Sequence, residues 1–323
     1  MRRPVVSIIM AVHNGGSQFK SVLKLLEDAL ALGCEVILVN DASTDETEAN
    51  ISTADLLTNH SKCQILRVDY HSAGLSREAG IKMATGKYVW FCDADDRMMI
   101  DGVKKAIDKL IQIDADVVWA NNLTMRDGLL RESKPKFKDV FQISDQRANG
   151  YYGIRDINRF KVLWNKFYRL DFIRSADIHF GHLRTAEDAM YNLDVFDRVS
   201  STASIDSCIY QYNIGSKASL THGKFTREVV LREQKLLERI AASFSPQASK
   251  VNDSFLWQEQ ILFFYMISRH LESEEYITAI GLSKIANKYV IPRSWKFRYL
   301  AKQYVAEFIV IIHLLKKWKI GGK

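Results

Sequence analysis

The chain has 323 residues, of which 47% are hydrophobic, 26% are charged and only four are proline, a composition that excludes a collagen-like or largely disordered protein. No CxxC pair occurs among the four cysteines (Cys34, Cys63, Cys92 and Cys208), so neither a zinc site nor a disulfide framework is indicated, and a reducing compartment is the simplest interpretation. The net charge of +7 is concentrated between Lys284 and Lys323, where ten basic residues accompany one acid and give +9, so the rest of the chain is close to neutral at −2.

The first predicted element is a buried strand at residues 5–12. This run is continuously apolar and rich in β-branched residues, which is typical of a strand covered on both faces of a sheet. Together with Arg2 and Arg3 it also resembles the start of a secretory signal peptide. The apolar run ends at His13 and Asn14, however, and no small-residue cleavage site follows. We therefore interpret it as a strand and expect no export signal.

Helical and strand patterns then alternate along the first 120 residues. Phe19, Val22, Leu23, Leu26 and Leu30 recur at helical spacing, and Gly33 follows as a stop signal. Further helices are expected at residues 45–59, 76–85 and 101–113, and further strands at residues 35–40, 64–68, 87–92 and 115–120. This alternation predicts an α/β fold in which helices cover a mainly parallel central sheet.

The pattern changes in the second half of the chain. Residues 124–150 form a basic, polar stretch that fits either a hairpin or a mobile loop. Beyond residue 225 only helical patterns remain. We therefore expect a domain at residues 1–225, whose halves divide near residue 122, and a helical C-terminal region at residues 226–323 with a basic amphipathic tail.

Polar residues follow three of the predicted strands, at His13-Asn14, Asp41-Ala-Ser-Thr-Asp45 and Asp93-Ala-Asp95-Asp96. Because ligands of open α/β sheets bind beyond the carboxyl ends of the strands, these segments predict a site along one edge. The aspartates at 93, 95 and 96 would repel one another unless a cation were bound, and carboxylates suit Mg²⁺ or Mn²⁺. Asp93 and Asp95 fit that task, whereas Asp96 could instead cap the following helix. Asp41 could accept hydrogen bonds from a base or ribose, or could simply form a turn.

Two further groups of charged residues lie near predicted helix starts. Arg77 follows the start expected at Ser76, where terminal amides and a guanidinium would favour an anionic phosphate, and an exposed surface arginine is the alternative. Glu187 and Asp188 begin a helix expected near Thr185. Acids in a first turn commonly complement the helix dipole, so a purely structural role for this pair stays open.

Taken together, these segments resemble family 2 glycosyltransferases of the GT-A fold. Seven short motifs carry the resemblance in the right order and at the right spacing, over residues 5–222, and their combination makes the signal specific. The motifs are Val6-Ser-Ile-Ile with His13-Asn14, Val39-Asn-Asp41-Ala-Ser-Thr-Asp45, Gly74-Leu-Ser-Arg77 with Gly80, Tyr88-Val-Trp-Phe-Cys-Asp93-Ala-Asp-Asp96, Trp164-Asn-Lys166-Phe-Tyr168-Arg169, Glu187-Asp188, and Tyr210-Gln-Tyr212 with Ser219-Leu-Thr221.

The resemblance implies an inverting, metal-dependent transferase. Such an enzyme moves a sugar from a nucleotide-diphosphate donor, here expected to be a UDP-sugar, to an acceptor hydroxyl of a cell-surface glycan or lipid-linked precursor. Residues 1–122 would form the donor half of the catalytic domain and residues 123–225 the acceptor half. The metal would be Mn²⁺ or Mg²⁺, which would neutralise charge on the departing diphosphate.

The resemblance also implies roles for individual residues. The donor would be contacted by Val12, His13, Asn14, Asp41, Arg77, Asp93 and Asp95. Asp95 would in addition hold the metal. Asp188 would be the catalytic base that takes the proton of the acceptor hydroxyl, with Glu187 beside it. Lys166, His182 and Arg184 are candidates for the acceptor side.

The sequence departs from the family pattern in ways that leave donor preference open. His13 stands where a tyrosine is usual, and Glu78 stands where an asparagine is usual. The QxxRW signature of processive synthases is missing, which favours transfer of single sugars. A sugar nucleotidyltransferase is the enzymatic alternative, although the GxGxR stretch expected after its first strand is missing. The other alternative is a non-catalytic membrane-associated scaffold of the same fold, which would have no reason to keep Asp95 and Asp188.

The basic tail predicts association with the inner face of the cell membrane. Residues 308–315 are apolar apart from one histidine, and lysines at 316, 317 and 319 follow them, which suits an anionic lipid surface better than nucleic acid. The apolar run is too short to span a bilayer. The alternative is a terminal helix that packs against the rest of the protein. We expect a cytoplasmic, peripheral protein with no nucleic-acid partner.

Overall fold

The computed structural model describes residues 3–126, 128–134, 141–142, 157–181 and 186–213, together with positions 236 and 239. The chain divides into two compact units, of which the first comprises Met1–Gly153 and Asn158–Ser219. The fold and the site below belong to this first unit. The predicted helical region at residues 226–323, with its basic tail, lies outside the described residues apart from the two isolated positions.

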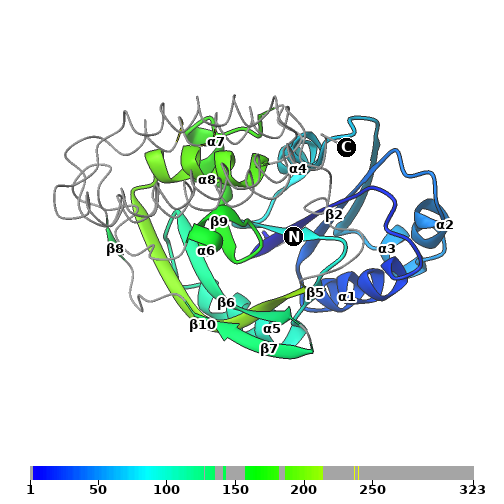
Figure 1. Ribbon diagram of the computed structural model, residues 1–323, viewed down its shortest axis with the longest axis horizontal. Helices are drawn as coiled ribbons and strands as arrows, with labels where there is room; N and C mark the ends of the chain where they lie inside the picture. The colour runs from blue at the N-terminus through cyan, green and yellow to red at the C-terminus, as the bar shows by residue number, and fades with distance from the viewer. Residues whose placement is uncertain are drawn as a thin grey trace, which may run out of the picture. The chain divides into compact units, whose positions relative to one another are not determined.

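One mixed sheet forms the centre of this unit (Figure 1), with the strand order β3-β2-β1-β4-β9-β6-β10-β5. The strands are β1 (Val6–Val12), β2 (Glu35–Asp41), β3 (Cys63–Val68), β4 (Tyr88–Asp93), β5 (Arg97–Met98), β6 (Val117–Arg126), β7 (Leu129–Ser133), β8 (Phe141–Gln142), β9 (Lys166–Arg169) and β10 (Ser201–Asn213). The first four strands in this order are parallel, as predicted. The sheet becomes mixed beyond them because β9 runs antiparallel to both β4 and β6.

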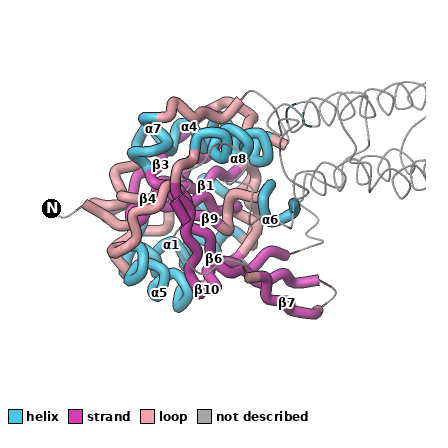
Figure 2. Tube along the Cα trace, turned by 90° about the vertical axis from the view of Figure 1, so that its left-hand side faces the viewer, coloured by secondary structure: helices cyan, strands magenta, loops and turns pink. Residues whose placement is uncertain are grey.

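Helices cover both faces of the sheet. They are α1 (Phe19–Ala31), α2 (Thr47–Ser52), α3 (Asp55–Thr58), α4 (Ala73–Met83), α5 (Ile100–Leu110), α6 (Ile157–Lys161), α7 (Leu170–Ser175) and α8 (Glu187–Arg198). Figures 1 and 2 show α4, α7 and α8 on one side of the sheet and α1 and α5 on the other. Ile8 and Met10 of β1 share a buried core with Leu26 of α1. The run predicted as a doubly covered strand is therefore buried on both faces, and the predicted α/β fold class is confirmed.

The register of the parallel strands brings their polar carboxyl ends to one edge. Ala11 of β1 lies beside Asp93 of β4, and Val12 lies beside Asn40 of β2. Helix α4 packs closely over this part of the sheet because Gly80 has no side chain. A Cβ atom at Gly80 would lie 2.5 Å from Cγ2 of Ile9, closer than real Cβ contacts allow.

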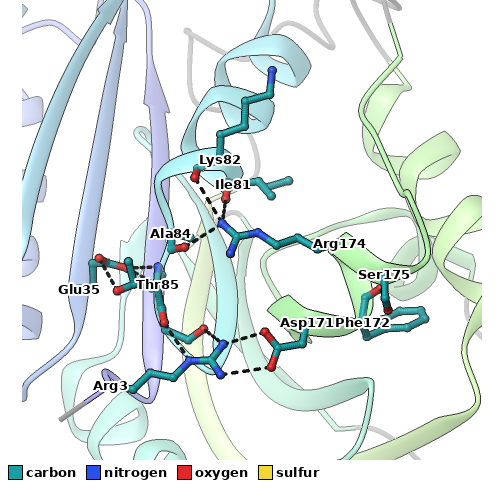
Figure 3. Close-up of polar contacts among 12 residues, drawn as sticks. Arg3, Glu35, Ile81, Lys82, Ala84, Thr85, Asp171, Phe172, Arg174 and Ser175 are labelled. Atoms are coloured by element: carbon teal, nitrogen blue, oxygen red, sulfur yellow. Dashed lines mark hydrogen bonds and ion pairs between the residues drawn. The ribbon is translucent and has the colours of Figure 1, made fainter.

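The far end of α4 is held at the opposite edge of the sheet (Figure 3). Arg174 of α7 points at the C-terminal end of α4 and donates to the carbonyl oxygens of Ile81 and Ala84, both at 2.9 Å. Because the last carbonyls of a helix have no partner within it, this guanidinium satisfies them. Arg3 pairs with Asp171 at 3.0 Å and ties the start of the chain to α7.

The fold corrects two sequence predictions, and it shows which of two predicted alternatives holds at the start of a third segment. Helix α4 begins at Ala73, not at Ser76, with Ser72 as its N-cap. The helical segment predicted at residues 45–59 is two short helices, α2 and α3. The polar stretch after residue 124 begins with the turn of a β6–β7 hairpin, the first of its two predicted alternatives, and Figure 2 shows β7 at the margin of the sheet.

Candidate active site

Arg77 of α4 joins three carboxylates from two other elements. Its Nη1 lies 2.8 Å from Oδ1 of Asp188 and 3.1 Å from Oε1 of Glu187, both in the first turn of α8. Its Nη2 lies 2.7 Å from Oδ1 of Asp93, at the end of β4. The Arg77 side chain is only 7% exposed. The structure thus brings together the predicted base, its neighbour and two predicted donor residues, Arg77 and Asp93.

The electrostatics of this cluster keep Arg77 charged. Burial opposes the charge of Arg77, but Asp188, Asp93 and Glu187 outweigh it and raise the pKa of the guanidinium above its usual range. Burial also raises the pKa of Asp188, to about 8, while Arg77 opposes that rise and Glu187 and Asp93 add to it. A base whose pKa lies near neutral pH is well matched to proton transfer.

Asp96, in the turn after β4, has a different partner from the one predicted. It does not cap helix α5, whose N-cap is Met99. Its carboxylate accepts from the hydroxyl of Tyr210 at 3.0 Å and from the backbone N–H of Asn213 at 2.9 Å, so it ties the turn to β10. Burial raises the pKa of Asp96 to about 8, and Asp93 adds to the rise. The hydroxyl oxygen of Tyr210 in turn accepts from the backbone N–H of Asp93, at 3.1 Å.

The aspartate turn suits a divalent cation that is shared with a ligand. The side chain of Asp95 in this turn is half-exposed, so a ligand can approach its carboxylate. Within the described ranges no three His, Cys, Asp or Glu side chains form a metal cage. Mg²⁺ and Mn²⁺ commonly bind to one or two carboxylates and take their remaining ligands from water and substrate phosphates. Asp95 therefore fits a cation that is bound together with a diphosphate.

Asp41 uses both carboxylate oxygens to hold the segment that precedes α4. Its oxygens accept from the backbone N–H groups of Tyr70, His71 and Ser72 at 2.7–2.9 Å, and from the hydroxyl of Ser76 at 3.0 Å. Burial would raise the pKa of Asp41, but these four donors outweigh it and lower the pKa. The predicted contact of Asp41 with a base stays a prediction, because four acceptor sites are already used by the protein.

The loop after β1 is fixed by the loop after β2. The backbone N–H of Thr44 donates to Oδ1 of Asn14 at 2.7 Å, so the amide nitrogen of Asn14 faces Nε2 of His13 at 3.1 Å. Nδ1 of His13 lies 2.5 Å from the carbonyl oxygen of Asp41. A carbonyl only accepts, so Nδ1 of His13 donates to it, and Nε2 is the nitrogen that faces the Asn14 amide. Val12 has its side chain in the core, so only its backbone can line a pocket.

Lys166, one of the predicted acceptor-side residues, is held by the protein itself. It is fully buried, and its ammonium donates to the carbonyl oxygens of Arg159, Phe160 and Val162 and to the side-chain oxygen of Asn165. Burial lowers the pKa of Lys166 well below its usual value. A side chain enclosed in this way closes the end of α6, and the acceptor-side role of Lys166 stays a prediction. The other two acceptor-side candidates, His182 and Arg184, lie outside the described residues.

Sequence reasoning missed the aromatic side chains that pack against the cluster around Arg77. The Phe180 ring stacks on Tyr191 of α8, with centroids 4.1 Å apart, and lies 5.9 Å from the guanidinium carbon of Arg77. Phe91 of β4 meets the Phe180 ring edge to face at 5.5 Å. No local pattern marks Phe180 as part of the site, since Arg77 and Phe91 are distant from it in the sequence. The family motif signalled the position of Tyr210 but not its bond to Asp96.

A family model and several relatives match this part of the chain. The model of glycosyl transferase family 2 matches residues 7–175, more than half of the chain. EpsH of Bacillus subtilis is 24% identical over 220 residues, which cover 66% of this chain and 62% of EpsH, so the match spans less than two thirds of that relative. The poly(ribitol-phosphate) beta-N-acetylglucosaminyltransferase TarS of Staphylococcus aureus is 21% identical over 216 residues, which cover 64% of this chain and 35% of TarS.

Solved structures share the fold. The crystal structure of S. aureus TarS 1–349 in complex with UDP-GlcNAc has a TM-score of 0.68 at 18% identity, and the match covers 88% of this chain and 81% of that one. The mannosyltransferase PcManGT from Pyrobaculum calidifontis, in complex with GDP-Man and Mn²⁺, has a TM-score of 0.50 at 12% identity and covers 98% and 87%. At these identities the likeness shows the fold alone, and it confirms the predicted GT-A fold. In the part of the chain that the structure describes, no helix is long and apolar enough to cross a bilayer.

Proposed function

This chain belongs to glycosyl transferase family 2, and from that premise we propose that it transfers a sugar from a UDP-sugar donor with inversion of configuration at the anomeric carbon, and that Asp188 is the base. The expected product is a cell-surface glycan or its lipid-linked precursor, extended by one sugar. The site geometry supports this proposal, and the names of relatives support the donor and the product.

One observation carries the proposal. Asp188 and Asp93 bind the same guanidinium, Asp188 through Nη1 at 2.8 Å and Asp93 through Nη2 at 2.7 Å. The candidate base is therefore separated from the aspartate turn by the width of one arginine head group. A donor whose diphosphate reached Asp95 would present its sugar to Asp188, with the acceptor hydroxyl between them. Attack on the anomeric carbon opposite the diphosphate inverts its configuration.

Different residues would assist the departure of the diphosphate and the attack by the acceptor hydroxyl. Asp95 would hold Mn²⁺ or Mg²⁺ against the diphosphate, and the cation supplies Lewis-acid neutralisation of the departing charge. Asp188 accepts the proton of the acceptor hydroxyl, which makes its oxygen a better nucleophile. Arg77 holds Asp188 and Asp93 in a fixed relation through two charge-assisted contacts. Glu187, 12% exposed and paired with Arg77, adds negative charge that favours protonation of Asp188.

Support for the donor comes from the relatives. TarS is named as an N-acetylglucosaminyltransferase, and a TarS structure with the same fold contains UDP-GlcNAc. We therefore propose a UDP-hexose or UDP-N-acetylhexosamine as donor. PcManGT contains GDP-Man with Mn²⁺, so GDP-mannose is the donor to compare. His13, in the loop after β1, stands where a tyrosine is usual, so donor preference is decided by comparing these nucleotide sugars.

We also propose that the basic tail holds the enzyme at an anionic membrane, near a lipid-linked acceptor. The ten basic residues between Lys284 and Lys323 support this, at about 1 kcal/mol for each one close to the lipid surface. Deleting residues from Ser294 onward should release the protein from phosphatidylglycerol vesicles while metal-dependent donor hydrolysis survives. Unchanged vesicle binding would refute the proposal, as would a truncated protein that fails to fold.

The function is tested by release of nucleoside diphosphate from a panel of nucleotide sugars. The purified full chain is incubated with UDP-glucose, UDP-galactose, UDP-GlcNAc or GDP-mannose, in Mn²⁺, in Mg²⁺ or in excess EDTA. We expect release from one UDP-sugar with metal and none with EDTA. Proton NMR of the first product formed should show the anomer opposite to that of the donor. Retention of configuration, or sugar-1-phosphate and nucleoside triphosphate as reactants, would overturn the proposal.

A further inference from the structure

Glu78 is a largely buried carboxylate of α4 that the mechanism above does not use. Its Oε1 lies 2.8 Å from Nδ1 of His179, and its Oε2 accepts from the backbone N–H of Phe180 at 3.1 Å. The side chain of Glu78 is 12% exposed, whereas that of His179 is 58% exposed. An exposed ion pair contributes little to stability, while a charged acceptor on a buried amide contributes more. The hydrogen bond to Phe180 therefore contributes more to stability than the ion pair with His179 does.

Phe180 links Glu78 to the candidate active site. The Phe180 side chain is buried, and its ring contacts Tyr191 of α8, Phe91 of β4 and the guanidinium of Arg77. The stacked pair with Tyr191 has an interplanar angle of 11° and a centroid distance of 4.1 Å. A shift of Phe180 would therefore move the surface on which Arg77 rests.

The contacts of Glu78 and Arg77 come from one face of α4. Gly74, Arg77 and Glu78 have the i, i+3, i+4 spacing of neighbours on a helix surface. A Cβ atom at Gly74 would lie 3.3 Å from Cβ of Phe180 and 3.4 Å from Cγ of Glu187. This face of α4 therefore packs directly against both Phe180 and the start of α8, so an added methyl group would press on both.

We infer that Glu78 is a positioning residue for Asp188, because it holds Phe180 beneath Arg77 and so fixes the guanidinium that binds Asp188. Glu78 touches neither substrate nor reacting atoms in this role. The inference rests on the proposed function in one respect, the assignment of Asp188 as the base.

The position of Arg77 affects the pH dependence of turnover, because it affects the pKa of Asp188. Among the residues that the structure describes, the charged and titratable groups that face Asp188 are Arg77 from α4, Glu187 from α8, Asp93 from β4, and Lys166 and Tyr168 from β9. Arg77 and Lys166 favour its ionised form, and Glu187 and Asp93 oppose it. Loss of Glu78 lets Arg77 withdraw, so the pKa of Asp188 rises and the base ionises at a higher pH. General loss of folding lowers kcat at every pH and leaves this titration in place.

The experiment compares Glu78→Ala with Glu78→Gln, which keeps an acceptor oxygen for the Phe180 amide. Lys82→Ala is the control, because Lys82 is exposed on the same helix. Initial rates of UDP release in the presence of acceptor are measured with the full chain between about pH 6 and pH 10. We expect Glu78→Ala to lower kcat roughly 10- to 100-fold near pH 7, to lose much less near pH 10, and to keep its donor KM within about twofold. Glu78→Gln and Lys82→Ala should stay within about threefold of wild type at each pH.

Two results would overturn the inference. One is a Glu78→Ala profile with the wild-type titration, and the other is a Glu78→Gln variant as impaired as Glu78→Ala. Should Glu78→Ala fail to fold, Gly74→Ala provides a second test, since its methyl group presses Phe180 and Glu187 away from α4 and should shift the titration in the same direction. An active Asp188→Asn enzyme would refute the proposed function itself. Wild-type kinetics of Glu78→Ala beside an inactive Asp188→Asn enzyme would refute only the role of Glu78.

Discussion

Asp188→Asn is the change that tests the proposed chemistry most directly. The amide has the shape of the carboxylate, so Oδ1 can still accept from Nη1 of Arg77, which lies 2.8 Å away in the native protein. It cannot take a proton from the acceptor hydroxyl. A general base typically contributes about 10²- to 10⁴-fold, which corresponds to roughly 3–5 kcal/mol of transition-state stabilisation. We expect kcat for transfer to fall within that range.

The assay separates donor binding from turnover and adds a pH profile. Isothermal titration with UDP and Mn²⁺ should give similar affinities for wild type and variant, because the change is on the acceptor side of the cluster. In the wild type only ionised Asp188 acts as a base. With a pKa of about 8, kcat/KM should rise about tenfold for each pH unit below that value and then level off. The residual activity of Asp188→Asn should lack this rise.

Glu187→Gln is the matched control, since Glu187 is the neighbouring acid and binds the same Nη1 at 3.1 Å. Removing its charge takes away a group that raises the pKa of Asp188, so the rise of kcat/KM should move to lower pH while the plateau stays within about tenfold of wild type. The reasoning is refuted if Asp188→Asn retains wild-type turnover and Glu187→Gln does not, because the base would then be Glu187.

Three further predictions concern the metal, the buried lysine and acid stability. Asp95→Ala should lower UDP release by about 10²-fold or more without changing the melting temperature, because this half-exposed carboxylate serves the cation and not the core; undiminished wild-type release in excess EDTA would contradict the metal assignment. Lys166→Met should lower the free energy of unfolding, measured in urea, by about 3 kcal/mol, because carbonyls of α6 lose their donor. A rise in acceptor KM with unchanged stability would instead support the acceptor-side role of Lys166. Asp116, buried beside Arg169 and Ser200, has its pKa lowered by both partners against the effect of burial. Asp116→Asn should therefore cost roughly 1.5–3 kcal/mol above about pH 4, and the difference should vanish as the pH falls through the lowered pKa of the folded state; a difference that persists in acid would assign the cost to packing.

The central strands were predictable from sequence because burial on both faces leaves a continuous apolar run. This holds for β1, β2 and β4, whose observed bounds lie within two residues of the predicted ones. Strand β9 was missed because it is four residues long and begins with Lys166, a residue type that seldom lies in a core. Strand β10 was missed because polar residues occupy some of its buried positions, with Thr202 7% and Ser207 4% exposed, so the apolar alternation is weak in the sequence.

The candidate site was predictable as a set of residue types but not as a set of contacts. Adjacent acids at a strand end and at a helix start are visible in the sequence. That Asp93 and Asp188 share one arginine is not, because 111 positions separate Arg77 from Asp188 and only the crossing of α4 over the sheet brings them together. The bond from Glu78 to Phe180 spans 102 positions and has the same explanation.

Asp41 illustrates why a motif alone does not decide what a residue does. Its carboxylate has room for about four hydrogen bonds, and the amides of Tyr70, His71 and Ser72 and the hydroxyl of Ser76 use all four. A nucleobase could bind Asp41 only by displacing one of these donors or by sharing an oxygen with it. His71 has φ = 48°, a left-handed conformation that costs energy in a non-glycine residue and is held in part by its bond to Asp41. The same carboxylate therefore sets the start of α4, on which Arg77 and Glu78 depend, so a loss of activity on replacing Asp41 would not by itself identify a base contact.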